Sequence, residues 1–352
     1  RNHMARVRLE ASVTGPTALP ALDEQLQAMR HASTIDTFRI EMLSEVEKLL
    51  IARRARAANP YTAIAVRDQR MFKGRHAEIA RIDDMLHAGL RDRAGWSGQN
   101  LVVVYGINRI GKTSLLRFLR DSALASGDFA TVLLDVQRLP SHREPALWGG
   151  LADAIRKAID PARAAATGRA TGPRRFKAQS EGDGFEDWFH QAVRSLGDRR
   201  LVIMIDELNV LDELWEPREC QRAGRRLKGL VEGHSNVRFV VCVQESYFRT
   251  LPQRDPTVDG SVALLRTGIA VGLGFLDTRA SEQLIREPMG EALRFTDDLV
   301  GRITYLTSGH PYYIHTLMHD LVGRALHEKR RIITLDHLDA VLLERLDHLG
   351  VA

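Results

Sequence analysis

Two glycines followed by a lysine and a threonine are the residues whose types and spacing most clearly indicate chemistry. Residues 106–113 read GINRIGKT, which matches the pattern GxxxxGKT of a phosphate-binding loop. The glycines let the backbone turn sharply and direct its N–H groups inward, toward a di- or triphosphate at the positive end of the following helix. The residues expected to contact a nucleotide are Gly106, Asn108, Arg109, Ile110, Gly111, Lys112, Thr113 and Ser114.

Lys112 and Thr113 have separate predicted roles in this loop. Lys112 would reach the β- and γ-phosphates, and the Thr113 hydroxyl would coordinate Mg²⁺. The apolar run 101–105 predicts a buried strand before the loop, and leucines at helical spacing predict a helix after it. A chance match in an ordinary turn would not have this strand, loop and helix context.

A pair of acids follows a second buried strand, over 201–205. In an ATPase with a phosphate loop, the first acid helps to hold Mg²⁺ and the second activates the attacking water. Two acids after a strand are a weak signal alone, but downstream of a phosphate loop they predict a metal ligand at Asp206 and a catalytic base at Glu207.

A third strand, over 237–243, also ends in polar residues. Gln244 is the preferred candidate to sense the γ-phosphate or orient the water, ahead of Ser246. A helix cap or an ordinary surface position explains these residues nearly as well.

Alternating strands and helices predict an α/β fold with a helical C-terminal part. The expected strands are 101–105, 129–135, 201–205, 237–243 and 269–275. Helices expected after the last strand are 281–289, 297–307, 312–327 and 335–349.

The N-terminal region carries apolar stripes at helical spacing over 20–58, after residues 1–3, which resemble the remnant of an expression tag ahead of Met4. These stripes need a partner surface, which could be the ATPase core, another protein or a second copy. The composition of 160–184 predicts a long flexible loop. The predicted domains are residues 1–58, 59–276 and 277–352.

Composition excludes some classes of protein and leaves others open. The 352 residues are 44% hydrophobic and 27% charged, as in ordinary globular proteins, and no apolar window predicts a membrane span. Two cysteines are too few for a disulfide framework and suit a reducing cytoplasm. A net charge of +5 and a pI of about 9.4 permit contact with DNA without indicating it.

Four motifs together resemble the STAND-type ATPases, in the archaeal-type branch related to AAA+ ATPases. They are FKGR ahead of Glu78, the phosphate loop, LVIMIDE and SGHPYY. The resemblance implies a five-stranded parallel core with helices on both faces, in which the sensor strand lies between the two nucleotide-binding strands, followed by an all-α lid. It also implies ATP or ADP with Mg²⁺ as cofactors, Arg75 beside the adenine, and Pro311 in contact with the base or ribose.

The resemblance implies a regulatory switch that hydrolyses ATP slowly, assembles into a homo-oligomer with ATP and controls a protein effector or sensor, in antiviral defence or signalling. The alternative is a DNA-directed AAA+ ATPase, similar to initiators or transposition regulators, which the positive charge favours, whereas GHPYY favours the switch. A scaffold with a purely structural nucleotide is a third hypothesis, against which Glu207 counts. The candidates for an arginine finger are Arg222, Arg225, Arg226, Arg249 and Arg266.

Overall fold

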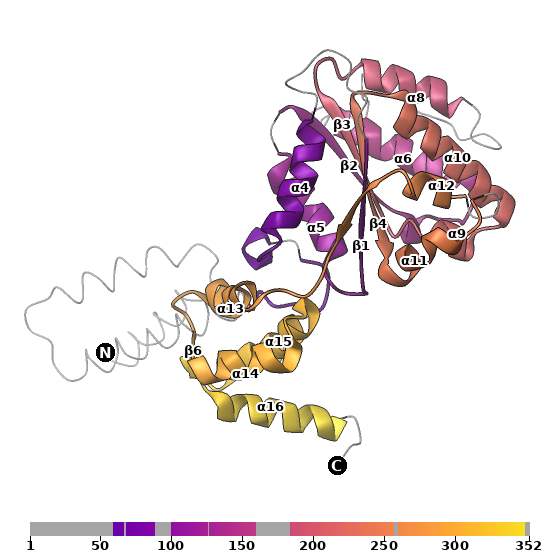
Figure 1. The fold of residues 1–352 in the computed structure, drawn as a ribbon. Coiled ribbons are helices and arrows are strands. Elements are labelled where there is room, and N and C mark those ends of the chain that lie inside the picture. Colours follow the sequence, from indigo (N-terminus) through magenta and orange to yellow (C-terminus); the bar gives the residue numbers. More distant parts are fainter. Residues whose placement is uncertain are drawn as a thin grey trace, which may run out of the picture. The chain divides into compact units, whose positions relative to one another are not determined.

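The computed structural model describes residues 59–66, 68–88, 100–125, 127–159, 184–256 and 260–348 (Figure 1). The apolar stripes predicted over 20–58 and almost all of the loop predicted over 160–184 lie outside these residues. Within the described ranges, no helix is both long enough and apolar enough to cross a membrane.

Five parallel strands form the central sheet, in the order β2-β3-β4-β1-β5. They are β1 (Leu101–Gly106), β2 (Phe129–Asp135), β3 (Arg200–Asp206), β4 (Val237–Gln244) and β5 (Ile269–Gly272). This confirms the predicted fold class, including the position of the sensor strand β4 between β1 and β3. β5 ends earlier than predicted, and Phe275, at the end of that apolar run, is exposed.

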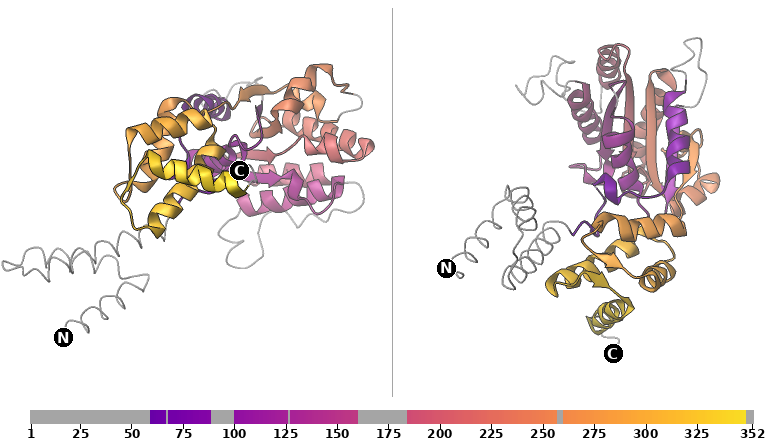
Figure 2. Two further views of the ribbon diagram at one scale, coloured as in Figure 1. Left: turned by 90° about the horizontal axis from the view of Figure 1, so that it is seen from below. Right: turned by 90° about the vertical axis from the view of Figure 1, so that its left-hand side faces the viewer.

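Helices cover both faces of the sheet, and Figure 2 shows these layers from two further directions. α4 (His76–His87) and α5 (Lys112–Phe118) pack on one face, and α6 (Glu144–Ile159), α8 (Phe185–Arg194) and α10 (Pro217–Gly233) on the other. Along β1, Val102 and Val104 belong to the first core, and Leu101 and Val103 to the second. Successive strand residues point to opposite faces, so a continuous apolar run supplies both cores.

Short helices follow the carboxyl ends of the strands. They are η3 (Val136–Arg138) after β2, α9 (Val210–Leu214) after β3, α11 (Glu245–Thr250) and η5 (Leu251–Gln253) after β4, and α12 (Val262–Leu265) before β5. The Asp212 carboxylate of α9 joins three of the neighbouring segments, because it accepts hydrogen bonds from the Cys220 thiol and from the hydroxyls of Tyr247 and Ser261. The sequence did not predict these helices, since segments this short show no period.

Two buried arginines, at the starts of β3 and β4, hold the C-terminal end of α4. Arg200 donates to the carbonyls of Leu86 and Ala88, at 3.0 and 2.7 Å, and Arg238 donates to the Ala88 carbonyl at 3.1 Å. Guanidinium groups complement the negative end of a helix, which explains this arrangement. Burial, with the nearby charge of Arg200, lowers the pKa of Arg238 to about 10.

The chain forms two compact units. In the described residues, the larger is 64–280 with Gly309–Tyr312, and it contains the sheet, η1 (Gln69–Met71) and the π-helical turn η2 (Leu119–Ala123). The smaller is 59–63, Ser281–Ser308 and the rest of the chain from Tyr313.

The C-terminal elements are α13 (Thr278–Arg286), η6 (Glu287–Met289), β6 (Arg294–Phe295), α14 (Asp297–Thr307), α15 (Pro311–His327), β7 (Ile332–Ile333) and α16 (Leu335–His348). The strands β6 and β7 form a short parallel pair that the sequence did not predict. His315 Nδ1 lies 3.3 Å from the Thr62 nitrogen, and His319 Nδ1 lies 2.8 Å from the Tyr61 carbonyl oxygen. Both histidines therefore contact the backbone of residues 61–62.

Candidate functional site

The phosphate loop joins the end of β1 to the start of α5, as the motif requires. Gly111 has φ of 107°, in the left-handed region where a side chain is disfavoured. A Cβ on Gly106 would lie 2.8 Å from Ile110 Cγ2 and 2.9 Å from the Leu273 carbonyl oxygen, so a larger residue would displace the loop. The two glycines of the motif are thus explained by conformation at one end and by close packing at the other.

Lys112 lies almost wholly inside this loop. Its Nζ donates to the carbonyl oxygens of Gly106 and Ile107, at 3.0 and 3.2 Å. An ammonium held by its own loop is already positioned where a phosphate chain would lie along the backbone N–H groups.

Thr113 and Asp206 bring the two predicted centres of chemistry together. The Thr113 hydroxyl donates to Asp206 Oδ2 at 2.6 Å, across 93 residues of sequence. Asp206 is only 2% exposed, and burial raises the pKa of its carboxyl group above the usual range of aspartate. Burial, with the nearby charge of Asp206, raises the pKa of the Cys242 thiol on the neighbouring strand. A hydroxyl and a carboxylate at this position are ligands that Mg²⁺ prefers.

Glu207 and Gln244 meet at the ends of β3 and β4. Burial raises the pKa of the Glu207 carboxyl group above the usual range of glutamate, and the Gln244 side chain opposes this effect by stabilising the ionised form. Glu207 has φ of 53°, which is uncommon for a residue with a side chain and is a form of strain found at functional sites. The structure therefore brings Gln244 to the acid predicted to be the catalytic base.

Ser114 faces a different part of the chain from the rest of the loop. Its Oγ accepts a hydrogen bond from the Val66 nitrogen at 3.0 Å, and Arg117, one turn later, donates to the Ala65 carbonyl at 2.6 Å. These contacts anchor residues 65–66 on α5.

Arg75 lies between the phosphate loop and the segment that follows β5. Its guanidinium donates to the carbonyl oxygens of Ile110 and Gly274, at 3.3 and 2.6 Å, and pairs with Glu78. Gly74 and Arg75 both have positive φ, of 68° and 67°, so the chain turns sharply just before α4. Desolvation of the buried guanidinium lowers the pKa of Arg75.

The four residues Gly309–Tyr312 pack with this unit, near the phosphate loop. The Leu276 nitrogen donates to the Gly309 carbonyl at 2.9 Å, and the ring of buried His310 lies 5.5 Å from that of Phe275. The Arg109 guanidinium carbon lies 4.2 Å from the centre of the Tyr312 ring, in cation–π geometry. Pro311, the predicted base or ribose contact, lies in this segment at the start of α15.

A pocket of about 430 Å³ opens beside Thr113 and Asp206. Asp135 also lines it, and Asp135 pairs in register with Asp206 across the β2–β3 ladder. Three arginines complete the polar wall, at positions 117, 120 and 138. Sequence reasoning missed Asp135, whose signal was an acid at the end of the strand predicted over 129–135. It also missed Asn209, which is buried two residues after Glu207.

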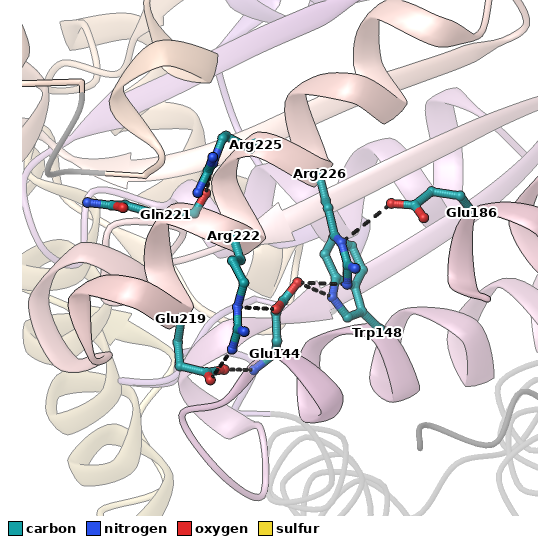
Figure 3. A network of polar contacts seen from close by, with 8 residues as sticks. All are labelled: Glu144, Trp148, Glu186, Glu219, Gln221, Arg222, Arg225 and Arg226. Carbon is teal, nitrogen blue, oxygen red and sulfur yellow. Dashed lines mark hydrogen bonds and ion pairs between the residues drawn. The ribbon is translucent and has the colours of Figure 1, made fainter. Parts of the chain in front are cut away.

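Three of the five arginine-finger candidates bind other elements of the chain. Figure 3 shows Arg222 and Arg226 of α10 directed to the carboxylate of Glu144. Arg266 donates to the carbonyls of Leu251, Pro252 and Arg254. Arg225 and Arg249 are exposed, as Arg266 is, and bond within their own helices: Arg225 donates to the Gln221 carbonyl, and Arg249 pairs with Glu245 one turn away.

The residues present fit a nucleotide with Mg²⁺. A Cβ on Gly111 would meet nothing within 4 Å, so the concave side of the loop is open at its turn into α5. Lys112 and the loop backbone would hold phosphates, and Thr113 with Asp206 would hold the cation. The described residues contain no cluster of three or more His, Cys, Asp or Glu side chains arranged to hold a metal ion. A cation here would need oxygen ligands from outside the protein, as Mg²⁺ in phosphate sites does.

Comparisons with known proteins establish the fold. No family model matches the chain, and no curated protein matches it. Among solved structures it resembles a Walker-type ATPase of Pyrococcus abyssi, with a TM-score of 0.54 and 16% identity over 83% of this chain and 79% of that chain. It also resembles the ORC2 protein of Aeropyrum pernix in its ADPNP–ADP complexes, with a TM-score of 0.53 and 13% identity over 77% and 70% of the two chains. The chain thus shares the α/β fold of these ATPases.

Proposed function

We propose that this chain binds ATP at the loop from Gly106 to Ser114 and hydrolyses it with Mg²⁺. The observation that carries the proposal is the 2.6 Å hydrogen bond from the Thr113 hydroxyl to Asp206, because it brings the end of the phosphate loop to the first acid of β3. Lys112, inside the loop, would bind the β- and γ-phosphates. A bound Mg²⁺ neutralises charge that develops on the phosphates.

Glu207 is the proposed base, and Gln244 the residue that orients the attacking water with it. The Gln244 side chain opposes the effect of burial on the pKa of Glu207, and the proposed arrangement has the amide and the carboxyl group share one water. The raised pKa of Glu207 brings a carboxyl group closer to the range in which it accepts a proton at neutral pH.

Arg75 and Pro311 are the proposed neighbours of the adenine. Arg75 bonds the Ile110 carbonyl, and residues 309–312 pack in the same unit as the phosphate loop, so both belong to the surroundings of the loop. The guanidinium of Arg75 is occupied by carbonyls, which favours a role in shaping the site over direct contact with the base.

For the use of this hydrolysis, a DNA-directed AAA+ ATPase that resembles initiators is the first candidate. It is supported by the likeness to an ORC2 protein and by a pI of about 9.4. Assembly of several copies with ATP bound would be part of such a function.

A STAND-type switch that controls a protein effector, in defence or signalling, is the second candidate. It is favoured by one observation, the packing of the Gly309–Tyr312 segment near the phosphate loop through Arg109 and Tyr312. A segment in contact with the loop could report which nucleotide is bound.

Two substitutions test the enzyme. Lys112→Ala should weaken ATP binding by about a hundredfold or more, because a charge-assisted contact to phosphate is lost. Glu207→Gln should keep binding and lower turnover by about a hundredfold or more, because the base is lost. Unchanged turnover in Glu207→Gln would remove Glu207 from the catalytic role.

Light scattering with a non-hydrolysable ATP analogue, with and without duplex DNA, separates the two uses. Assembly that needs DNA, and weakens steeply with salt, is expected for the DNA-directed function. Assembly with the analogue alone would favour the switch.

A further inference from the structure

Asn209 is a buried polar residue two positions after Glu207, and the proposed mechanism of hydrolysis gives it no role. It is fully buried and stands directly before α9, at the N-cap position. Asn is preferred at N-caps because its side chain can accept a hydrogen bond from the first turn of its own helix. Here it makes no such bond. Its amide is directed elsewhere.

The amide of Asn209 instead joins the end of β4 to α9. Its Oδ1 accepts a hydrogen bond from the Gln244 backbone nitrogen at 3.2 Å, and its Nδ2 donates to Glu213 at 3.0 Å. The β3–β4 ladder has its last paired residues at Ile205 and Val241. Beyond that point Gln244 would lack a backbone partner on this side, and a buried N–H without a partner is costly. The side chain of Asn209 therefore continues the ladder.

The hydrogen bond from the Gln244 backbone to Asn209 fixes the position from which the Gln244 side chain extends. The Gln244 side chain acts on the Glu207 carboxyl group, whose pKa it lowers against the larger effect of burial, and Glu207 adopts a positive φ two residues before Asn209. We propose that Asn209 is a positioning residue for ATP hydrolysis: by binding the Gln244 backbone it fixes the end of β4 against the acidic end of β3, and so sets how Gln244 meets Glu207. This inference rests on the proposed ATPase function.

A purely structural role for Asn209 makes different predictions. If Asn209 only filled the core, its loss would lower the folded fraction, and kcat per folded molecule would not change. If it positions Gln244, kcat should fall while KM and nucleotide affinity stay, because the hydrogen bonds of the Asn209 side chain go to Gln244 and Glu213 and not to the phosphate loop. Misplacement of a catalytic group by about 1 Å costs about a hundredfold in rate.

The variants are chosen because Asn209 Oδ1 accepts a hydrogen bond and Nδ2 donates one. Asn209→Ala removes both bonds. Asn209→Asp keeps an acceptor for the Gln244 backbone but opposes Glu213 with a second negative charge. The double variant Asn209→Asp/Glu213→Gln returns the pair to one negative charge and lets the amide introduced on α9 donate to the carboxylate introduced before it, in the reverse direction. Glu213→Gln alone is the control, since its amide oxygen still accepts from Asn209.

The experiment measures steady-state ATP hydrolysis, affinity for a fluorescent ADP, and hydrogen exchange of the segment 240–246 in the full chain without nucleotide. Asn209→Ala and Asn209→Asp should lower kcat by about ten- to a hundredfold with KM within about twofold, and should speed exchange at Gln244. The double variant should recover most of kcat, and Glu213→Gln should resemble the wild type. Unchanged kcat, a parallel change of kcat and KM, or unchanged exchange at Gln244 would overturn the inference.

The two proposals fail in distinguishable ways. Absence of ATP turnover in the wild type would contradict the ATPase function and, with it, the catalytic role of Asn209. Turnover that depends on Glu207 but not on Asn209 would contradict only the positioning role. Hydrogen exchange decides separately whether Asn209 holds the end of β4, because that measurement needs no nucleotide.

Discussion

Two buried carboxylates in the larger unit, Glu144 on α6 and Asp206 on β3, are compensated in opposite ways. Glu144 is fully buried, and its oxygens lie 3.1 Å from Arg222 Nε and 3.0 Å from Arg226 Nη1. The indole N–H of Trp148 also donates to it, at 2.9 Å. The charge of Glu144 is thus balanced by α10, and the result is a link between α6 and α10 (Figure 3).

Asp206 has hydrogen bonds but no ion pair among the described residues. Its donors are neutral: the Thr113 hydroxyl and the Glu207 backbone N–H. Burial of a carboxylate without an ion pair is unfavourable by several kcal/mol, and the raised pKa of Asp206, which the nearby charge of Lys112 only partly offsets, reflects this. The chain therefore retains a destabilised acid next to its phosphate loop, whereas a comparable acid elsewhere is paired with two arginines. A bound cation would supply a charge that pairs directly with Asp206.

Replacing the carboxylate by an amide should have opposite effects on stability at the two acids. The largest effect, on ATP turnover, is expected at Asp206. Asp206→Asn should lower ATP turnover by about a thousandfold, equivalent to about 4 kcal/mol, because a cation ligand is lost. Its free energy of unfolding, measured by urea denaturation without nucleotide or Mg²⁺, should stay equal or rise, since a buried charge has been removed. A clear loss of stability in this variant would contradict the comparison.

Glu144→Gln should mainly affect folding. The amide can still accept from Trp148, but two guanidinium groups lose their counter-charge, and breaking a buried pair from one side costs about 3 kcal/mol. The free energy of unfolding should fall by that amount, while affinity for ADP, measured on the folded fraction, stays at the wild-type value. Weakened ADP binding with unchanged stability would show that the Glu144 network belongs to the nucleotide site.

Two adjacent arginines on α10 test how much the Glu144 network contributes to stability. Arg226→Ala should lower the free energy of unfolding by about 2 kcal/mol, because it leaves the Glu144 carboxylate with one guanidinium fewer. Arg225→Ala is the matched control one residue away, and as a surface substitution it should change stability by less than about 0.5 kcal/mol. Thermal and urea unfolding of the two variants measure the difference. Equal stability would mean that the network contributes little.

The sequence predicted most of the fold because its signals are local. Each strand is a continuous apolar run, and the long helices have several turns over which a period can appear, as in 297–307, whose predicted limits match α14. The short helices α9, α11 and α12 lack that length. The β6–β7 pair joins two-residue segments far apart in the chain, and nothing local distinguishes them.

The candidate site was predictable where a motif fixes residue types at fixed spacing. Lys112, Thr113 and Asp206 belong to such motifs, and the structure brings them together. Asn209 could not be found this way, because its partner is a backbone nitrogen on another strand, 35 residues away. The arginine candidates could not be separated either, since the acid that binds Arg226 lies 82 residues earlier.

His315, in the smaller unit, extends the comparison to a buried ionisable group with no proposed ligand. Burial lowers its pKa to about 4, and its Nδ1 lies 3.3 Å from the backbone nitrogen of Thr62, which donates to it. The unfolded chain binds the proton with the ordinary pKa near 6.5, so it holds more protons than the folded chain between these values. Stability is therefore complete above the unfolded pKa and falls as the pH drops through this window.

Between about pH 7.5 and about pH 5.5, His315 should make the smaller unit less stable by about 1.4 kcal/mol. His315→Asn keeps an acceptor for the Thr62 N–H without titrating, so it should lose this part of the pH dependence. Hydrogen exchange of α14 and α15 at the two pH values measures the effect separately from the larger unit. An identical pH dependence in the variant would mean that His315 binds its proton with the same pKa in the folded and the unfolded chain, and would contradict the effect of burial.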